Sequence, residues 1–388
     1  MTTHPNIPFN RPSLEGRELE YVAASARSGE LSCDGPYSRR AAALLKEALG
    51  VEEVLLTTSC TAALELSALL ADVAPGDVVV LPSFTYVSTA LAFARAGARL
   101  RFADIEPVTL GIDPRSVADL LTPEVAAVVP VHYAGIGCDI DGLVAALNGR
   151  AVSMIEDNAH GLFGAIGDRP LGSFGRFSCL SFHDTKSFGC GEGGAIAITD
   201  RADVERAHVL YDKGTNRRAF VAGEVDAYTW VDIGSSFGLA DLLAAHLWGQ
   251  LEARDRILEK RRAITARYVE LLTPEADRLG IQLMQRPADR RSAEQMFYVL
   301  VDTRERRDAV LAALRSAGIG ATFHYVPLHD APGAKAFLDV ETDCPVATDI
   351  SGRLLRLPFY NALGPDDVAQ VATSLVRALE RTSPTSPR

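Results

Sequence analysis

The alternation of apolar runs with helix-like segments between Thr57 and Ala197 constrains the fold more than any other feature of the sequence. The helical pattern SCTAALELSALLADV begins with small hydroxyl residues and is followed by a PGD turn and the apolar run VVVLP. Three similar rounds follow, TALAFARAG with RLRFADI, SVADLLTPE with AAVVPVHY, and DGLVAALNG with AVSMIED, before the run FSCLSF. Continuous apolar strands separated by helices predict an α/β fold with a parallel sheet covered on both faces.

The pattern changes after about Ala240. A long helical segment, DLLAAHLWGQLEARDRILEKRRAITARYVELL, precedes QMFYVLVD, RDAVLAALRSAG and ATFHYVPL, which predict a strand, a helix and a strand. We therefore predict a large domain over residues 1–245 and a smaller α+β domain over residues 246–381 that includes the long linking helix. Residues 382–388, which contain two prolines and no apolar face, are predicted to be a disordered tail.

Composition excludes several classes of function. Lys plus Arg total 39 against 50 Asp plus Glu, a net charge of -11, so the general attraction that drives binding to nucleic acids or anionic membranes is absent. The start, MTTHPNIPFNRPSL, does not resemble a signal peptide, and no apolar run approaches the roughly 20 residues that span a bilayer. The six cysteines are scattered without a C-x-x-C pair, which predicts neither a metal site nor a disulfide framework and fits a cytoplasmic location.

Four short segments fall at predicted strand ends, where open α/β sheets bind ligands. The first, residues 58–62, begins a helix and would suit a phosphate, although Ser and Thr at this place could simply cap the helix. In the second, residues 82–86, Tyr86 could stack on a flat ring or only pack against its neighbours.

The third segment, IEDNAH, carries acidic residues to the end of a buried strand. Burying a carboxylate is costly unless it is paired, either with backbone amides or an Arg, or with the protonated nitrogen of a cofactor.

The fourth segment is SFHDTKSFGCGEGG. Lys186 alone would be read as a solvated surface lysine, but the glycines after it let the backbone approach closely and take unusual dihedral angles. A desolvated lysine has a lowered pKa and can attack a carbonyl group.

Together these four segments are the parts that pyridoxal 5′-phosphate (PLP) chemistry requires. A helix start holds the phosphate, an aromatic residue covers the ring, an acid keeps the pyridine nitrogen protonated, and a lysine forms the Schiff base. The order along the chain, with Asp157 ahead of Lys186, strengthens the interpretation.

The motifs SCTAALEL, PSFTYVSTA, VPVHYAG, EDNAHG, SFHDTKSFGCGEGG and HYVPLH also resemble those of the DegT/DnrJ/StrS family of sugar-nucleotide aminotransferases, over roughly Pro5 to Val376. The resemblance implies the aspartate-aminotransferase-like PLP fold, type I, with a large domain whose mostly parallel sheet lies between helices and a smaller α+β domain. KGTNRRAFVAGEVDAYTWVDIGSS and VPVHYAGIGCDIDG are most similar to the branch that acts on dTDP-4-keto-6-deoxyhexoses.

The resemblance assigns roles by position. Lys186 would form the Schiff base and move the proton, Asp157 would pair with the pyridine nitrogen, and His160 would lie near the 3-hydroxyl of the ring, over which Tyr86 stacks. The remaining cofactor-binding residues would be Ser59, Cys60, Thr61, Ser181 and His183.

For the substrate, the resemblance places Lys213, Asn216 and Arg217 near the diphosphate or the sugar, and Tyr325 and His329 at the sugar pocket. The positive charges suit a pyrophosphate. His132, His183, His324 and His329 could equally be ordinary hydrogen-bonded histidines.

One position departs from the family. Many relatives have an Asn that reaches the phosphate in the neighbouring subunit, where this chain has Gly238. Ser235 or Ser236 is the candidate replacement.

The function that the resemblance implies is amino transfer from L-glutamate to C4 of a dTDP-4-keto-6-deoxyhexose by a homodimer with shared active sites. The product would be a dTDP-4-amino-4,6-dideoxyhexose of either configuration at C4, for a natural product or a surface polysaccharide. Three alternatives remain: a PLP-dependent sugar dehydratase, which would carry histidine in place of Lys186; a catalytically silent binding protein; and a nicotinamide enzyme, which would need a G-x-G-x-x-G turn that the sequence lacks.

Overall fold

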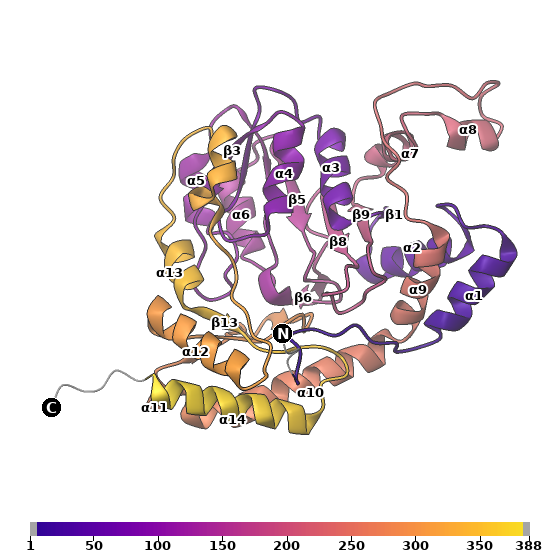
Figure 1. Cartoon of the computed structure of the whole chain (residues 1–388). Helices are drawn as coiled ribbons and strands as arrows, with labels where there is room; N and C mark the ends of the chain where they lie inside the picture. Colours follow the sequence, from indigo (N-terminus) through magenta and orange to yellow (C-terminus); the bar gives the residue numbers. More distant parts are fainter. Residues whose placement is uncertain (1–5, 383–388) are drawn as a thin grey trace.

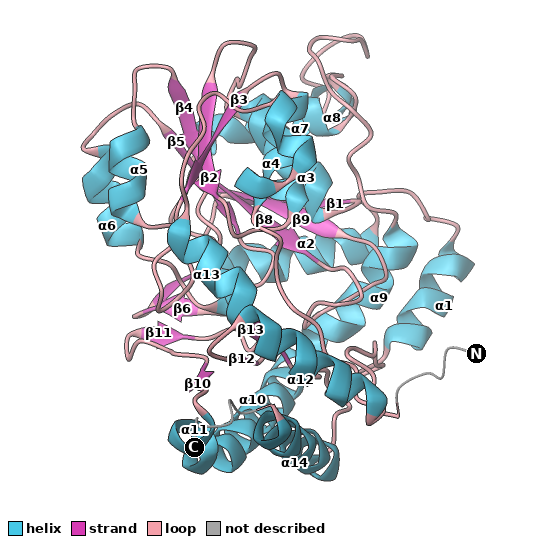
Figure 2. Cartoon of the chain, turned by 60° about the vertical axis from the view of Figure 1, so that its left-hand side comes forward, coloured by secondary structure: helices cyan, strands magenta, loops and turns pink. Residues whose placement is uncertain are grey.

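A seven-stranded sheet forms the centre of the larger part of the molecule, as the computed structural model shows for residues 6–382 (Figures 1 and 2). The strand order is β1-β9-β8-β5-β4-β2-β3. The bounds are β1 (Glu53–Thr57), β2 (Val78–Pro82), β3 (Arg99–Ala103), β4 (Val125–Val128), β5 (Ser153–Asp157), β8 (Phe177–Ser181) and β9 (Gly194–Ile198).

The sheet is mostly parallel, which confirms the predicted fold class. Strands β3, β2, β4, β5 and β8 pair in parallel, and β9 pairs antiparallel with both β8 and β1. Every strand predicted between Val78 and Phe182 is present. The predicted alternation does not extend to β9, which follows β8 without an intervening helix.

Helices cover both faces of the sheet (Figure 2). One face carries α3 (Cys60–Leu70), α4 (Val87–Arg95) and α7 (Val204–Tyr211); the other carries α2 (Pro36–Leu49), α5 (Pro114–Leu120), α6 (Ile140–Leu147) and α9 (Asp241–Glu252), with α1 (Glu18–Ser28) packed outside α9. In β2, Val79 and Leu81 join the core beneath α3 and α4, whereas Val78 and Val80 join the core beneath α5 and α6. Because both faces are buried, the strands are apolar throughout instead of alternating.

The C-terminal part is a smaller α+β unit. Its three-stranded antiparallel sheet, β10-β12-β13, packs with α10, α12 and α14 (Figure 2). The bounds are α10 (Arg254–Leu272), α11 (Ala276–Leu279), β10 (Gln282–Leu283), β12 (Tyr298–Leu300), α12 (Arg304–Ser316), α13 (Pro345–Arg353), β13 (Leu354–Arg356) and α14 (Pro365–Arg381). A second small sheet, β11-β6-β7, consists of β6 (Ala165–Ile166), β7 (Arg169–Pro170) and β11 (Arg290–Arg291).

Two expectations for this part are wrong in detail. The predicted linking helix is two helices, α9 and α10, which meet at Ala253, and α9 packs against α1 and α2 of the larger part. Among residues 6–382, the predicted strand ATFHYVPL pairs only through the single bridge Thr322–Arg356, and β13 takes the place beside β12. The predicted tail lies, except for Thr382, outside the described residues. Between residues 6 and 382, no helix is long and apolar enough to cross a membrane.

Candidate active site

A cavity of about 510 Å³ lies where β5 and β8 end and α3 begins. Residues from the C-terminal part form its remaining wall. Ten of the residues singled out from the sequence line this one cavity: Ser59, Cys60, Thr61, Tyr86, Asp157, His160, Ser181, His183, Lys186 and Tyr325. The topology therefore brings together the four segments that the sequence places at strand ends.

The start of α3 is suited to bind an anion. The Ser59 hydroxyl caps the helix by accepting a hydrogen bond from the Ala62 N–H at 3.0 Å, as the simpler interpretation of this segment predicts. Cys60 and Thr61 are the first two helical residues, so their N–H groups have no acceptor within the helix and carry its positive end. Gly194 lies against this turn so closely that a Cβ there would be 2.4 Å from the Cys60 nitrogen.

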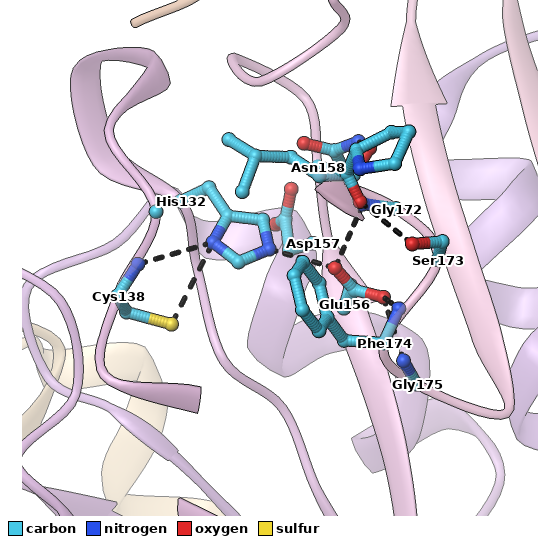
Figure 3. A network of polar contacts seen from close by, with 12 residues as sticks. His132, Cys138, Glu156, Asp157, Asn158, Gly172, Ser173, Phe174 and Gly175 are labelled. Atoms are coloured by element: carbon cyan, nitrogen blue, oxygen red, sulfur yellow. Dashed lines mark hydrogen bonds and ion pairs between the residues drawn. The ribbon is translucent and has the colours of Figure 1, made fainter. Parts of the chain in front are cut away.

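The two acidic residues at the end of β5 have different environments (Figure 3). Glu156 is fully buried and accepts hydrogen bonds from the N–H groups of Gly172, Phe174 and Gly175 at 2.7–2.8 Å. His132 Nε2 donates to the same carboxylate at 2.8 Å. Glu156 is thus the carboxylate paired with backbone amides, and His132 is an ordinary hydrogen-bonded histidine.

Asp157 points the other way, into the cavity. Its carboxylate accepts hydrogen bonds from the Thr89 hydroxyl at 2.7 Å and from the Ala159 N–H at 3.1 Å. Two hydrogen bonds leave lone pairs of this carboxylate free for a cation or a protonated ring nitrogen. Thr89 is a positioning residue that the sequence analysis does not identify.

Lys186 lies in the loop between β8 and β9, and its amine lines the cavity. Gln295 of the C-terminal part fixes this loop by accepting hydrogen bonds from the N–H and hydroxyl of Ser187 at 3.1 and 3.0 Å. Within the described part of the chain, the Lys186 amine makes no hydrogen bond or ion pair. Burial, reinforced by the positive charge of Arg356, lowers the pKa of Lys186 to about 8, although Cys60 and Asp157 oppose the shift. A substantial fraction of this amine is therefore neutral near physiological pH and can act as a nucleophile or base.

The aromatic wall of the cavity comes from three segments. Tyr86 is 60% exposed and stands 6.4 Å, between ring centroids, from Tyr325. His324 stacks on Tyr325 with the ring centroids 4.0 Å apart. His160 Nδ1 is buried and has no partner among residues 6–382, so it is available to a bound molecule. Burial and the nearby positive charges hold the pKa of His160 well below its usual value, so its ring is neutral.

Arg356, which the sequence analysis does not identify, contributes a buried guanidinium to the same cavity. It is the last residue of β13 and hydrogen-bonds to His324 through Nη1. The only signal in the sequence is a charged residue within the apolar run LLRLP.

Six of the predicted site residues lie outside the cavity. Lys213, Asn216, Arg217, Ser235 and Ser236 belong to residues 213–236, here called the arm, which contains α8 (Arg217–Val221) and projects from the body of the molecule (Figure 1). In the arm, Lys213 and Arg217 pair with Asp212. His329, which is partly buried, hydrogen-bonds through Nδ1 to the Ser83 hydroxyl at 2.5 Å, as an ordinary hydrogen-bonded histidine does.

These residues fit PLP. The free N–H groups at the start of α3 suit its phosphate, the Asp157 carboxylate suits its ring nitrogen, the unpartnered His160 Nδ1 suits a hydroxyl, and the free amine suits its aldehyde. No group of three or more potential metal ligands is found among residues 6–382.

Comparison with known proteins agrees with this geometry. Residues 12–376 match the DegT/DnrJ/EryC1/StrS aminotransferase family. The spore coat polysaccharide biosynthesis protein SpsC of Bacillus subtilis (strain 168) is 30% identical over 380 residues, which cover 94% of this chain and 95% of SpsC.

Solved structures are similar over nearly the whole chain. The aminotransferase TlmJ from Streptoalloteichus hindustanus superposes with a TM-score of 0.89 at 30% identity, covering 97% of this chain and 100% of TlmJ. Spr1654 from Streptococcus pneumoniae, solved in its PMP form, has the same fold, with a TM-score of 0.90 at 24% identity over 97% of this chain and 100% of Spr1654. The predicted class, a PLP-dependent aminotransferase, is confirmed at the level of family and fold. The chain belongs to the DegT/DnrJ/EryC1/StrS aminotransferase family.

Proposed function

We propose that the protein is a PLP-dependent aminotransferase that moves an amino group from L-glutamate to C4 of a dTDP-4-keto-6-deoxyhexose. The products would be 2-oxoglutarate and a dTDP-4-amino-4,6-dideoxyhexose. The observation that carries the proposal is the placement of the Lys186 amine, which has no partner among residues 6–382, in one cavity with the Asp157 carboxylate and the start of α3. The similar protein SpsC functions in the biosynthesis of a polysaccharide, which supports a sugar as the acceptor of the amino group.

The residues of the cavity would hold the cofactor by its charged groups. Cys60 and Thr61 would donate backbone N–H groups to the phosphate, with the hydroxyl of Ser181 beside them. Asp157 would accept a hydrogen bond from the protonated ring nitrogen and keep it protonated, and Thr89 keeps that carboxylate oriented. When bound, PLP supplies an electron sink and carries nitrogen between the two half-reactions.

Lys186 would move the proton in both directions. In the first half-reaction its neutral amine would take the α-proton of glutamate, and in the second it would return a proton to C4 of the sugar. The α-carbon of glutamate is oxidised to a ketone while C4 is reduced to a carbon that bears the amine, so the exchange is balanced. The lowered pKa suits both tasks, because an amine with a pKa of about 8 exchanges protons readily near neutral pH.

We further propose a homodimer in which the arm of one subunit completes the site of the other. Large apolar side chains on the arm are exposed, Val221 by 74%, Trp230 by 78% and Ile233 by 58%. An apolar surface of this kind usually marks a protein interface. Docking on a partner would also move Lys213 and Arg217 from solvent to a place where they could bind a diphosphate.

A sugar dehydratase on the same fold remains the second candidate, and Lys186 disfavours it, since such relatives carry histidine at this position. The product distinguishes the two functions. Dehydration removes a hydroxyl group from the sugar, whereas amino transfer leaves nitrogen on C4 and generates 2-oxoglutarate.

The test is incubation of the purified protein, loaded with PLP, with dTDP-4-keto-6-deoxyglucose and L-glutamate, followed by NMR of the sugar. We expect a 4-amino sugar and an equal amount of 2-oxoglutarate, and the coupling of the C4 proton gives the configuration. Lys186→Ala should abolish the product, whereas Lys335→Ala, at an exposed position outside the cavity, should not. Absence of an amino sugar with the wild-type protein would contradict the proposal.

A further inference from the structure

Arg356 differs from Arg261, another buried arginine, in the way its charge is satisfied. Arg261 is also buried, and each of its three guanidinium nitrogens donates a hydrogen bond, to the carbonyl oxygens of Glu294 and Gln295 and to the Asn361 side chain. In Arg356, Nε is buried without a partner, and Nη2 donates to no atom of residues 6–382. A buried guanidinium with unused donors is costly unless a ligand supplies the acceptor.

No carboxylate in the described part of the chain pairs with Arg356. Its only polar side-chain partner is His324, whose Nε2 accepts from Nη1, and Phe9 covers the guanidinium with its ring centroid at 4.7 Å. Burial, with the charges of Arg356 and Lys186, lowers the pKa of His324 to about 2. His324 therefore orients the guanidinium without neutralising it, and the cavity contains an uncompensated positive charge.

The type and position of this charge select its ligand. A guanidinium pairs best with a planar carboxylate. The phosphate of the cofactor already has a place at the start of α3, and the proposed sugar acceptor carries no carboxylate. Arg356 and Lys186 line the same cavity, so an anion on Arg356 lies in the space into which the reacting amine opens.

We propose that Arg356 binds the α-carboxylate of the amino donor. This site rests on the proposed function, since it presumes an amino-acid donor. The α-carboxylate is attached directly to the carbon that reacts at Lys186, whereas the γ-carboxylate of glutamate lies three bonds away from that carbon. Binding the α-carboxylate thus places the α-proton beside the lysine and makes the site selective for amino acids over simple amines.

The experiment compares wild type, Arg356→Gln and Arg356→Lys with three donors, L-glutamate, L-glutamine and L-isoglutamine, in which the α-carboxylate is an amide. The half-reaction with each donor is followed by the loss of the visible absorption of the cofactor. We expect wild type to prefer L-glutamate over L-isoglutamine by roughly 30-fold or more, the usual effect of removing one partner of a buried charge pair. Arg356→Gln should lose this preference, and Arg356→Lys should restore part of it.

Binding without turnover gives a second readout. α-Methyl-L-glutamate has no α-proton and cannot react further, so its Kd can be measured by calorimetry. We expect Arg356→Gln to weaken this Kd by a similar factor while PLP content and the unfolding midpoint stay near wild type. Arg353→Gln is the matched control, because it removes the same charge three residues earlier and outside the cavity.

Two outcomes would overturn the inference. In one, Arg356→Gln keeps the wild-type preference for L-glutamate over L-isoglutamine. In the other, it reacts normally with glutamate and loses only the reaction with the sugar, which would place an anionic group of the acceptor on Arg356. If Arg356 controls donor binding but wild type passes no nitrogen to the sugar nucleotide, the inference is supported and the proposed acceptor fails.

Discussion

Glu156 and Asp157 are adjacent in β5, and we expect their amide substitutions to have opposite consequences. In Glu156→Gln, the remaining carbonyl oxygen can still accept from Phe174 and Gly175, but as a neutral acceptor. The new NH₂ group faces two donors that lose their acceptor, the buried Gly172 N–H and the Nε2–H of His132. Weakening two charge-assisted hydrogen bonds costs about 1 kcal/mol each, and each of the two unsatisfied buried donors costs about 1–3 kcal/mol.

The free energy of unfolding should therefore fall by roughly 4–8 kcal/mol, which at its lower end overlaps the loss measured when one partner of a buried charge pair is removed. Urea unfolding of the cofactor-free protein, followed by fluorescence and circular dichroism, measures this difference. Glu156→Gln that remains folded should still bind PLP, because its side chain does not face the cavity.

Asp157→Asn is the matched control. The amide can keep both contacts, since its oxygen accepts from the Ala159 N–H and its NH₂ can donate to the Thr89 hydroxyl. The free energy of unfolding should change by less than about 1 kcal/mol, whereas amino transfer should fall severely because the ring nitrogen loses its anionic partner. A Glu156→Gln variant as stable as Asp157→Asn would refute this division of roles.

Two further predictions concern Lys186 and the arm. Only the neutral amine attacks an aldehyde, so the rate at which the cofactor-free protein captures PLP should depend on pH. The rate should rise about tenfold per pH unit below about 8, the pKa of Lys186, and level off above it. Stopped-flow absorbance measures this rate, and a plateau reached only above pH 10 would show that the lysine is not desolvated. Trp230 is exposed on the arm, so Trp230→Ser should shift the protein from dimer to monomer in sedimentation velocity and lower the activity per subunit. A wild-type protein that is monomeric at micromolar concentration would contradict the role given to the arm.

Much of the larger part of the fold follows from the sequence, because strands buried on both faces are continuous apolar runs. The runs from VVVLP to FSCLSF are strands, and the polar residues at their ends meet in one cavity. Periodicity carries no information on direction, however, so the antiparallel course of β9 could not be predicted. Nor could it be predicted which of two apolar segments, ATFHYVPL or LLRLP, pairs with β12, since both fit a strand.

The site could be predicted from the sequence only in part, and the reason is similar. Asp157 ends one predicted strand and Lys186 follows another, so the topology of the sheet alone brings them together. Arg356 arrives from the C-terminal part, and its role depends on which acceptors surround it in three dimensions. The arm residues, such as Lys213, do not line the cavity that the described residues form, so nothing within residues 6–382 relates them to it.

Because β9 runs opposite to β8, the chain returns to the edge of the sheet from which it left. Ser181 and Gly194 are paired in register, and the Phe182 N–H donates to the Gly193 carbonyl at 2.8 Å, so residues 182–193 leave and re-enter the sheet at one point. A loop anchored in this way can change in length or composition without altering the pairing of either strand. We therefore expect that residues 182–193 could be exchanged between proteins of this fold, which would change the position of the lysine amine while the pairing of β8 with β9 stays the same.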